Sequence, residues 1–501
     1  MKKVNNKSMN IKILFVYPDF ENLGVEYLMA ILKKNGYPVD LYFYNAFDPY
    51  FNKTYNINYL EHSKRILKCD PDIICFSSVT DNYPFQIKMA KTIKQLNSEK
   101  LILFGGIHPT SLPEIVLSND FVDAVVIGEG EISLLNFLKK IKKDKSNKLT
   151  LPDEQINGIL FKKDKNIIGI YQEGELINLN DLPLPHKEPF YKAEPIFKRE
   201  YLIMTSRGCP YTCSYCINDL YNKIRGKSLI RYRDSKNVIE ELIWAKEKFN
   251  IKYVHFADDD FGIKIDWLKD FAKDYKKYIN LPYLCSINPL TITEEKVKLL
   301  KSSNCVDIQM GVQSLDEKIC SKILKRPSNN IKISEAIKII KKHKIFLQVD
   351  HLYGIPEDTI DNHEKALLFY NTYRPNLISL FFLNYYPKTT ITEYALSNSI
   401  ISKEEQTKLE RGEYKPVGLH NKMANFKEDL GIIFLYNYLP FLPKKLLEVS
   451  IKKKLYRFIK FKSYLILFAI PRLIITLTDR RYFTGRGYII KFFKRLFNNF
   501  L

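Results

Sequence analysis

The chain has 501 residues, of which 46% are hydrophobic and 27% charged. This balance is typical of globular domains and excludes a largely disordered protein, and the length predicts two to four domains. The formal net charge is +22, but Lys444 to Leu501 carries fifteen Lys or Arg against two acids, a net of +13. The rest of the chain is only mildly basic, which argues against a nucleic-acid partner.

The first third alternates strand-like and helix-like segments. Apolar runs typical of buried strands occur at 11–17, 39–44, 73–77, 101–104 and 124–127, with segments of helical spacing between them. This alternation predicts an N-terminal α/β domain over residues 1–148, built on a doubly wound parallel sheet. Sheets of this kind bind ligands at the carboxyl ends of their strands.

Three loops at those strand ends carry distinctive residues. They are Ser77-Ser78-Val79, Gly105-Gly106-Ile107-His108-Pro109-Thr110 and Gly128-Glu129-Gly130-Glu131. Their glycines allow a backbone to approach a bulky ligand closely and to take positive φ angles. His108 lies inside the second loop, and we expect it to hydrogen-bond locally and not to bind a metal.

Residues 149–198 form a predicted linker. Segments 159–163 and 167–171 indicate a hairpin. The stretch Asp181-Leu182-Pro183-Leu184-Pro185 predicts an extended connector, because each Pro disfavours helix in the residue before it. We therefore place a domain boundary here, ahead of a second domain over residues 199–396.

The second domain opens with three cysteines in a Cys-x3-Cys-x2-Cys spacing, Cys209, Cys213 and Cys216. Three thiolates this close suit one compact centre. A four-iron cluster is normally closed by four thiolates, so three leave one iron open to a substrate or cofactor. A structural zinc site needs four ligands, and the sequence has no second Cys pair. The other cysteines are interpreted as buried core thiols: Cys69, Cys75, Cys285, Cys305 and Cys320.

About six repeats of strand and helix follow from Tyr201, which predicts a partial (β/α)6 barrel open on one side. Functional groups of such barrels sit at the carboxyl ends of the strands. The segments expected there are Asp258-Asp259-Asp260, Gly311-Val312-Gln313-Ser314, Gly354-Ile355-Pro356-Glu357-Asp358-Thr359 and Tyr386-Pro387-Lys388-Thr389.

The cysteine loop, with Tyr215 just before its last Cys, resembles the signature of the radical S-adenosylmethionine (SAM) enzymes. In that family three Cys hold a [4Fe-4S] cluster, SAM chelates the fourth iron, and an electron from the cluster splits SAM to give a 5′-deoxyadenosyl radical. The resemblance implies that Cys209, Cys213 and Cys216 hold the cluster. It also implies that Tyr215 lies against the adenine.

The barrel motifs extend this resemblance to about residue 396. It implies that Asp259 and Asp260 lie near the SAM amino group. It further implies contacts of Gln313, Ser314 and Arg326 with the SAM carboxylate and ribose, and it places Gly354 in the loop that packs beside the adenine. Lys388 departs from the family, which has Gly at this position of its Tyr-Pro-Gly-Thr segment.

The N-terminal loops resemble the cobalamin-binding domain found ahead of many radical SAM domains. The residues implied to bind cobalamin are Ser77, Ser78, Val79, Gly105, Gly106, Gly128, Glu129, Gly130 and Glu131. Domains that ligate cobalt through histidine carry Asp-x-His-x-x-Gly after the first strand, and Asp19 to Gly24 contains no His. A cobalt without a histidine ligand from below is therefore expected.

Residues 397–501 form a predicted basic, apolar and mostly helical extension. Neither 432–443 nor 464–477 reaches the roughly 18 to 20 uninterrupted apolar residues that a membrane span needs. Basic residues interleaved with apolar ones between Lys452 and Lys462 suit a helix in an anionic membrane interface. A basic helical layer packed on the barrel explains the same pattern, and both interpretations stay open.

Taken together, the resemblances imply an enzyme that uses a [4Fe-4S] cluster, SAM and cobalamin to methylate an unactivated carbon of a small-molecule or lipid-like substrate. Two alternatives stay open: a radical rearrangement or cyclisation without methyl transfer, and a non-catalytic cobalamin-binding sensor. We expect a cytoplasmic protein that receives electrons from a donor such as flavodoxin or ferredoxin. Peripheral contact with the inner face of the membrane is a further hypothesis. No catalytic side chain is assigned.

Overall fold

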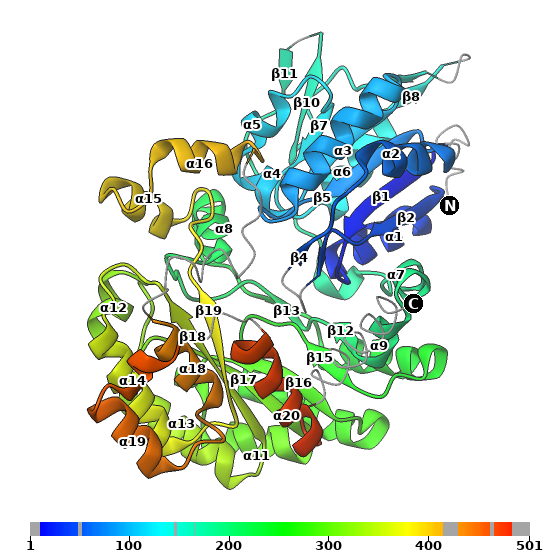
Figure 1. Cartoon of the computed structure of the whole chain (residues 1–501). Helices are drawn as coiled ribbons and strands as arrows, with labels where there is room; N and C mark the ends of the chain where they lie inside the picture. Colours follow the sequence, from blue (N-terminus) through cyan, green and yellow to red (C-terminus); the bar gives the residue numbers. More distant parts are fainter. Residues whose placement is uncertain are drawn as a thin grey trace, which may run out of the picture.

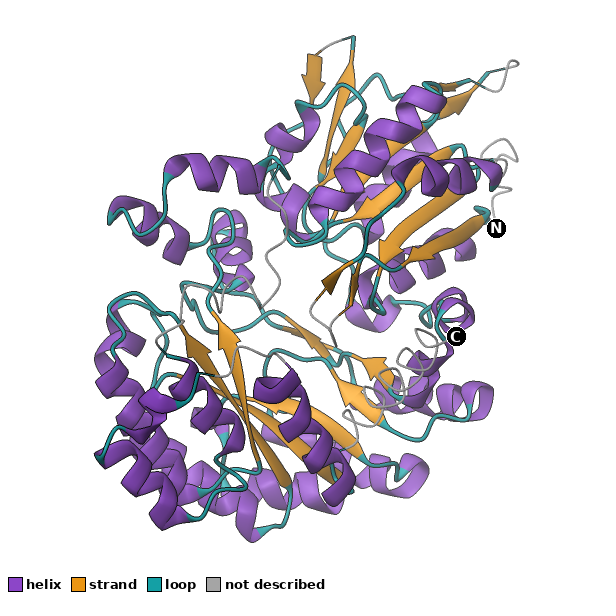
Figure 2. Cartoon of the chain, in the orientation of Figure 1, coloured by secondary structure: helices purple, strands orange, loops and turns teal. Residues whose placement is uncertain are grey.

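The computed structural model describes residues 11–48, 53–144, 148–164, 166–413, 429–460 and 465–482. Two α/β units lie one above the other, and the helices of the C-terminal extension lie mainly against the second (Figures 1 and 2). The predicted α/β architecture, a doubly wound sheet followed by a partial barrel and a helical extension, is confirmed.

The N-terminal unit is built on a sheet in the order β11-β10-β7-β6-β5-β1-β2. Its central strands β1, β5 and β6 are almost entirely buried, because helices cover both faces. The parallel strands are β1 (Ile13–Pro18), β2 (Val39–Tyr44), β5 (Ile73–Ser77), β6 (Leu101–Gly105) and β7 (Ala124–Val126). Two short antiparallel pairs flank the sheet, β3 (Phe47–Asp48) with β4 (Lys53–Thr54) and β8 (Lys142–Lys143) with β9 (Leu149–Thr150).

Each face of this sheet has its own hydrophobic core. One face packs against α1 (Leu23–Lys34), α6 (Glu131–Lys140) and α7 (Glu188–Ala193), and the other against α2 (Tyr59–Lys68), α3 (Tyr83–Leu96) and α5 (Pro113–Leu117). The short helix α4 (Ile107–Ser111) follows the Gly105-Gly106 loop. The helix α1 begins at Asn22, whose side chain accepts a hydrogen bond from the Val25 amide (2.9 Å).

The hairpin that the sequence assigned to the linker belongs to this sheet. β10 (Ile159–Lys163) pairs antiparallel with β7, and β11 (Asn166–Ile168) pairs with β10. The pairing covers an edge of β7 and buries Ile159 and Phe161 in the core beside α6. The boundary predicted at residue 148 is therefore wrong, and the N-terminal unit continues through α7 to Ala193.

The second unit contains six parallel strands in chain order, which confirms the partial barrel. They are β12 (Tyr201–Ile203), β15 (Val254–Phe256), β16 (Tyr283–Ile287), β17 (Cys305–Gln313), β18 (Phe346–Tyr353) and β19 (Leu377–Phe382). A short pair, β13 (Ser206–Arg207) and β14 (Arg231–Tyr232), lies beside the cysteine loop. In β17, Ile308, Met310 and Val312 enter the hydrophobic core, which leaves Gln309 and Gln313 on the opposite face of the strand.

Helices follow the barrel strands. They are α8 (Ile217–Arg225), α9 (Ser235–Phe249), α10 (Ile265–Asp274), α11 (Glu294–Ser302), α12 (Glu317–Lys322), α13 (Asn330–Lys342), α14 (Ile360–Tyr373) and α15 (Thr390–Ser397). Four of the five cysteines outside the motif are buried, as predicted, but Cys69 is half-buried at the end of α2.

The C-terminal extension completes the barrel core. Its described helices are α16 (Lys403–Glu410), α18 (Leu430–Tyr438), α19 (Lys444–Lys452) and α20 (Ile470–Thr478). Tyr436, Leu447 and Ile451 are buried in the same cluster as the barrel strands. This supports the packed helical layer over residues 430–459. Among the described residues, no helix is both long and apolar enough to cross a membrane.

Candidate functional site

The carboxyl ends of the two sheets face each other. Asp81, after β5, accepts a hydrogen bond from the Tyr386 hydroxyl, after β19 (2.7 Å). Glu129, after β7, forms an ion pair with Arg207, after β12 (2.5 Å). The loops predicted to bind cobalamin therefore meet the loops predicted to bind the cluster and SAM.

The cysteine loop is anchored by the first of the three consecutive aspartates. The buried Asp258 carboxylate accepts hydrogen bonds from the Thr205 hydroxyl (2.7 Å), the Thr205 amide (3.1 Å) and the Ser206 hydroxyl (2.6 Å). Gly208 follows with φ of 96°, and a Cβ there would lie 2.0 Å from the Leu229 carbonyl oxygen. A larger residue at this position would therefore displace the loop.

Side-chain donors point at two of the three sulfurs. Arg326 Nη1 lies 3.6 Å from Cys213 Sγ, and Asn218 Nδ2 lies 3.8 Å from Cys216 Sγ. Donors of this kind suit thiolates, which carry negative charge. Burial raises the pKa of Cys209 to about 12 and that of Cys216 to about 11, so iron binding has to be coupled to proton release.

The three motif cysteines lie on one short loop. Within the described ranges, no group of three His, Cys, Asp or Glu side chains is placed to hold a single metal ion. A [4Fe-4S] cluster takes one thiolate at each of three irons. Cys209, Cys213 and Cys216 on one short loop fit that requirement.

Arg326 joins the cysteine loop to the end of β17. Its Nη2 donates to the Gly311 carbonyl oxygen (2.5 Å) while Nη1 faces Cys213. Gln313 has φ of 71°, and a Cβ on Gly311 would lie 2.9 Å from Gln313 Nε2. Gly311 therefore leaves room for the Gln313 and Arg326 side chains. The structure thus brings these predicted SAM residues together beside the cluster loop.

Three other predicted SAM residues have different surroundings. Tyr215 is partly buried and packs against the small apolar cluster around Ile319 and Leu324. Ser314 is buried, and its hydroxyl accepts a hydrogen bond from the Asp316 amide (3.2 Å) at the start of α12. Gly354, with φ of 77°, lines a cavity described below.

Asp259 and Asp260 differ from each other. Asp259 is exposed and accepts a hydrogen bond from Asn218 Nδ2 (3.0 Å), the same group that faces Cys216. Asp260 is 3% exposed and accepts hydrogen bonds from the Asn288 amide (3.1 Å) and the Thr291 hydroxyl (3.2 Å). Asp260 therefore anchors the turn after β16, and we retain Asp259 alone as a proposed SAM contact.

The sequence interpretation missed Asp350 on β18. It lies opposite Gly311 in the sheet register and accepts a hydrogen bond from Gln309 Nε2 at Oδ2 (2.8 Å). Its Oδ1 is buried and has no hydrogen-bond partner among the described residues. Burial raises the pKa of this carboxyl to about 7. An unused acceptor beside Gly311 fits a hydroxyl group such as those of the SAM ribose. The available signal was the polar residues Gln309 and Asp350 within two strands that are mainly apolar.

The glycines of the predicted cobalamin loops make room for the chain itself. A Cβ on Gly106 would lie 2.8 Å from the Ser78 carbonyl oxygen, so this glycine lets the loops after β5 and β6 touch. A Cβ on Gly128 would lie 2.4 Å from Glu173 Oε1. Ser78 is buried, and its hydroxyl is hydrogen-bonded to Gln86. Both glycines take the positive φ angles that were expected, 94° and 70°. Their role in cobalamin binding stays a prediction.

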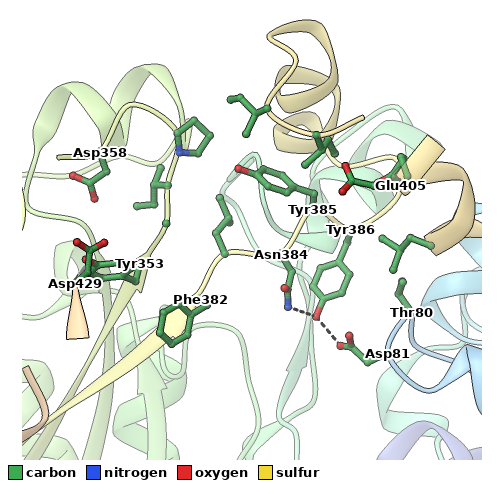
Figure 3. A pocket seen from close by; sticks show the side chains of 18 of the residues that line it. Thr80, Asp81, Tyr353, Asp358, Phe382, Asn384, Tyr385, Tyr386, Glu405 and Asp429 are labelled. Carbon is green, nitrogen blue, oxygen red and sulfur yellow. Dashed lines mark hydrogen bonds between the residues drawn. The ribbon is translucent and has the colours of Figure 1, made fainter. Parts of the chain in front are cut away.

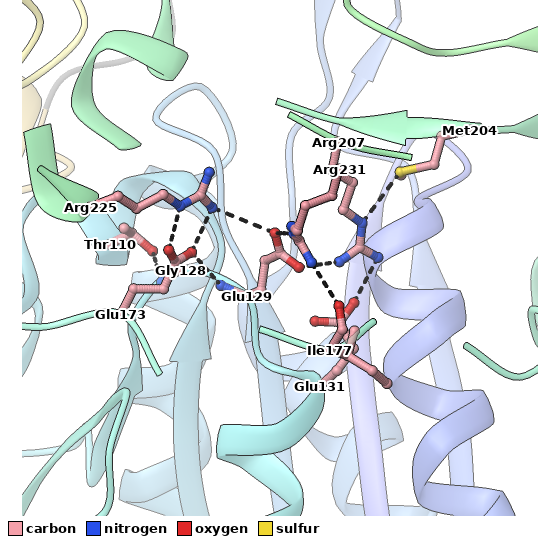
Figure 4. Close-up of polar contacts among 10 residues, drawn as sticks. All are labelled: Thr110, Gly128, Glu129, Glu131, Glu173, Ile177, Met204, Arg207, Arg225 and Arg231. Atoms are coloured by element: carbon pink, nitrogen blue, oxygen red, sulfur yellow. Dashed lines mark hydrogen bonds and ion pairs between the residues drawn. The ribbon is translucent and has the colours of Figure 1, made fainter. Parts of the chain in front are cut away.

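The glutamates of the third loop form ion pairs with the barrel (Figure 4). Glu129 is paired with Arg207, Arg225 and Arg231, and Glu131 is paired with Arg207 (2.7 Å). Although burial opposes the charge, Arg207 and Arg231 hold the pKa of Glu129 below its ordinary value. The two glutamates thus join the N-terminal unit to the cysteine loop.

Among the described residues of the loop after β1, no histidine occupies the position of an axial cobalt ligand. Glu21 stands at the His position of the Asp-x-His-x-x-Gly spacing and pairs with the buried Lys187 (2.6 Å), which also pairs with Glu26 (2.7 Å). His108 hydrogen-bonds through both ring nitrogens, with Thr80 Oγ1 in the N-terminal unit (3.2 Å) and with the Glu410 carbonyl oxygen of α16 (3.1 Å). The contact with Thr80 agrees with the local role expected for His108, whereas the contact with the C-terminal extension was not predicted.

Comparison with known proteins matches both units. Residues 11–138 match the B12 binding domain, and residues 203–370 match the radical SAM superfamily. An uncharacterized methyltransferase of Pyrococcus horikoshii is 26% identical over 69% of this chain and 74% of that protein. The anaerobic magnesium-protoporphyrin IX monomethyl ester cyclase of Cereibacter sphaeroides is 21% identical over 73% of this chain and 61% of that protein.

Among solved structures, the radical SAM methyltransferase TsrM from Kitasatospora setae superimposes with a TM-score of 0.60. The match covers 77% of this chain and 76% of that chain at 15% identity, and at this identity it establishes the fold alone. The family matches and the paired arrangement of cysteine loop and N-terminal sheet agree. The chain belongs to the radical SAM enzymes that carry a cobalamin-binding domain, whose cofactors are a [4Fe-4S] cluster, SAM and cobalamin.

Proposed function

We propose that this enzyme transfers a methyl group to an unactivated carbon of a small molecule. The observation that carries the proposal is a cavity of about 610 Å³. It lies between the loops at the carboxyl ends of the two sheets, which we call the two facing edges. Thr80 and Asp81 line it directly after the predicted cobalamin loop of β5, and Gly354 lines it from the predicted SAM loop of β18. A substrate held there would lie between a methyl carrier and a radical source.

The roles of the chain's own residues follow from their contacts. In this family, the cluster and SAM supply a 5′-deoxyadenosyl radical that abstracts a hydrogen atom, and cobalamin carries a methyl group taken from a second SAM. Cys209, Cys213 and Cys216 would hold the cluster, and Arg326 would orient its loop. Asp350 would accept a hydrogen bond from bound SAM. The hydrogen bond from Tyr386 to Asp81 connects the two edges.

The test uses protein reconstituted anaerobically with iron, sulfide and cobalamin, reduced by flavodoxin or dithionite. We expect two SAM-derived products: 5′-deoxyadenosine, from radical formation, and S-adenosylhomocysteine, whose formation should require cobalamin. Transfer of label from methyl-deuterated SAM to a small molecule would complete the proposal. Formation of 5′-deoxyadenosine with no cobalamin-dependent S-adenosylhomocysteine would contradict it.

That contrary outcome would favour a second candidate, a radical cyclisation or rearrangement. The specific support for it is the likeness to the magnesium-protoporphyrin ester cyclase, which covers 73% of this chain. The two candidates share the cluster and SAM site, so they differ in whether a methyl group leaves SAM.

Peripheral membrane contact is proposed for the surface of α19 and the turn after it. Leu446 and Phe458 are 49% and 81% exposed, and Lys452, Lys453 and Lys454 are exposed between them. Exposed apolar groups beside cations suit an anionic lipid surface, and a lipid-like substrate could be reached from it. Sedimentation with vesicles containing phosphatidylserine, compared with phosphatidylcholine alone, tests this. Equal binding to both vesicles would contradict it.

A further inference from the structure

The cavity between the facing edges has walls from three parts of the chain. Thr80 and Asp81 come from the N-terminal unit, and Gly354 and Tyr386 come from the ends of barrel strands (Figure 3). Glu405 of α16 lies in the C-terminal extension. Its volume, about 610 Å³, is in the range of small-molecule sites. The chemistry of these walls indicates what the cavity accepts.

The cavity wall is acidic. Four carboxylates line it, Asp81, Asp358, Glu405 and Asp429, and none of the described lining residues is Lys or Arg. The base among them, His363, is buried, and burial lowers its pKa to about 4, so it is neutral near pH 7. A cavity wall that has several carboxylates and no Lys or Arg among its described residues attracts positive charge.

The same wall is aromatic. Tyr353, Phe382, Tyr385 and Tyr386 line the cavity, and Tyr353 stacks on His363 at a centroid distance of 4.2 Å. Side chains of this kind bury the apolar part of a ligand and also attract cations to their ring faces. Both properties suit a ligand that has a hydrophobic body and a positive end.

Asp358 is held in place by its own loop. Its side chain is only 4% exposed, and Oδ1 accepts hydrogen bonds from the Thr359 amide (2.9 Å) and Asn362 Nδ2 (3.1 Å). The second oxygen, Oδ2, lies 3.4 Å from His363 Nε2. These hydrogen bonds therefore fix the orientation of the carboxylate at the cavity wall.

A buried chain of hydrogen bonds supports Asp358 from behind. His363 Nδ1 lies 3.1 Å from the Tyr436 hydroxyl, which lies 3.2 Å from His351 Nε2. His351 Nδ1 in turn lies 3.0 Å from the Tyr370 hydroxyl. If Tyr370 donates to His351, each hydroxyl or ring N–H of the chain can donate to the next, as far as His363 Nδ1. The arrangement fixes the orientation of the His363 ring, whose Nε2 lies 3.4 Å from Asp358 Oδ2.

Asp358 shares its end of the cavity with Asp429. Both lie beside Tyr353, whereas Asp81 and Tyr386 lie at the other end (Figure 3). These two carboxyl groups place acidic oxygens together at one end of the cavity. A cation bound at this end would be attracted by both.

We propose that the cavity binds the methyl acceptor as a protonated amine, with the ammonium group at Asp358 and Asp429 and an apolar body against the aromatic wall. The identification of this ligand as the methyl acceptor rests on the proposed function. The preference for an amine does not, because it follows from the wall alone.

The experiment measures equilibrium binding of three probes of similar shape to the reconstituted enzyme: 2-phenylethylamine, 3-phenylpropionate and neutral 2-phenylethanol. The amine should bind at least about tenfold more tightly than the carboxylate, with the alcohol between them. Asp358→Asn should weaken amine binding about tenfold. Glu357→Gln is the matched control, because the exposed Glu357 bonds Tyr394 and does not line the cavity.

Equal or tighter binding of the carboxylate would overturn the inference, as would the absence of saturable amine binding. The probe comparison on the unaltered enzyme decides this even if Asp358→Asn fails to fold. Displacement of the amine by cobalamin would assign the cavity to cobalamin and also overturn it. Amine binding without methyl transfer would contradict the proposed function only, whereas methyl transfer with a preference for the carboxylate would contradict this inference only.

Discussion

The two facing edges use their motif residues in different ways. On the barrel edge, Cys213, Arg326 and Gly311 are brought together around one space, as their motifs predict. On the N-terminal edge, Gly106 and Gly128 make room for Ser78 and Glu173 of the chain itself. A cysteine or arginine motif predicts the kind of group that it binds, whereas a glycine motif predicts only that the backbone needs space at that position.

The largest expected effect tests the barrel edge. Cys213→Ala should abolish the cluster and all 5′-deoxyadenosine formation, because the cluster would lose one of three protein ligands. Iron content and product analysis measure this. Cys69→Ala, which changes the half-buried cysteine at the end of α2, should retain both. Normal SAM cleavage by Cys213→Ala would contradict the cluster assignment.

Breaking the connection between the edges should have the next largest effect. Glu129→Gln removes the charge that pairs with Arg207, Arg225 and Arg231, and should destabilise the protein by about 3 kcal/mol because these cations stay half-buried without it. Chemical denaturation measures the loss. Glu154→Gln, at an exposed pair with Lys140, should change stability by less than about 0.5 kcal/mol. Equal effects of the two changes would show that the network does not join the units.

The N-terminal edge should also show a pH dependence of stability. Burial lowers the pKa of His108 from 6.5 to about 4, so the folded state takes up this proton less readily than the unfolded state. Neutral His108 therefore makes its full contribution to the free energy of unfolding above pH 6.5. This contribution is lost as the pH falls towards 4, which lowers the free energy of unfolding by about 3 kcal/mol. His108→Gln should flatten that part of the stability profile. An unchanged profile would contradict the buried, neutral state of His108.

The smallest effect is expected at Lys388. Lys388 has φ of 61°, so a lysine takes the left-handed region that glycine adopts without a steric penalty. Lys388→Gly should relieve this strain but increase the freedom of the unfolded chain, with a net change within about 1 kcal/mol. A thermal unfolding midpoint measures it. A loss of several kcal/mol would show that the lysine side chain stabilises the turn.

Sequence patterns predicted the fold well where a strand or helix buries its own apolar residues. The five parallel N-terminal strands all lie where apolar runs placed them, and the six strands expected from Tyr201 onward are present. The hairpin at 159–168 was also found, but its assignment to the linker was wrong, because pairing with β7 is a long-range contact that local pattern does not encode.

The prediction of site residues was limited in the same way, because local sequence pattern does not show which residues meet in the folded chain. The Asp258-Asp259-Asp260 run is uniform in sequence, yet one residue anchors the cysteine loop, one faces Asn218 and one anchors the turn after β16. Asp350 and the acidic cavity were missed because their residues come from strands and helices far apart in the chain. Only the folded chain places Asp81, Asp358 and Asp429 around one space.

Asp429, directly before α18, lines the cavity, and Tyr436 of α18 contacts His363 behind the wall. The residues proposed to hold the cluster and SAM lie instead on the cysteine loop and the barrel strands. A substitution in the extension can therefore change which molecule the cavity accepts without altering the proposed radical-generating site.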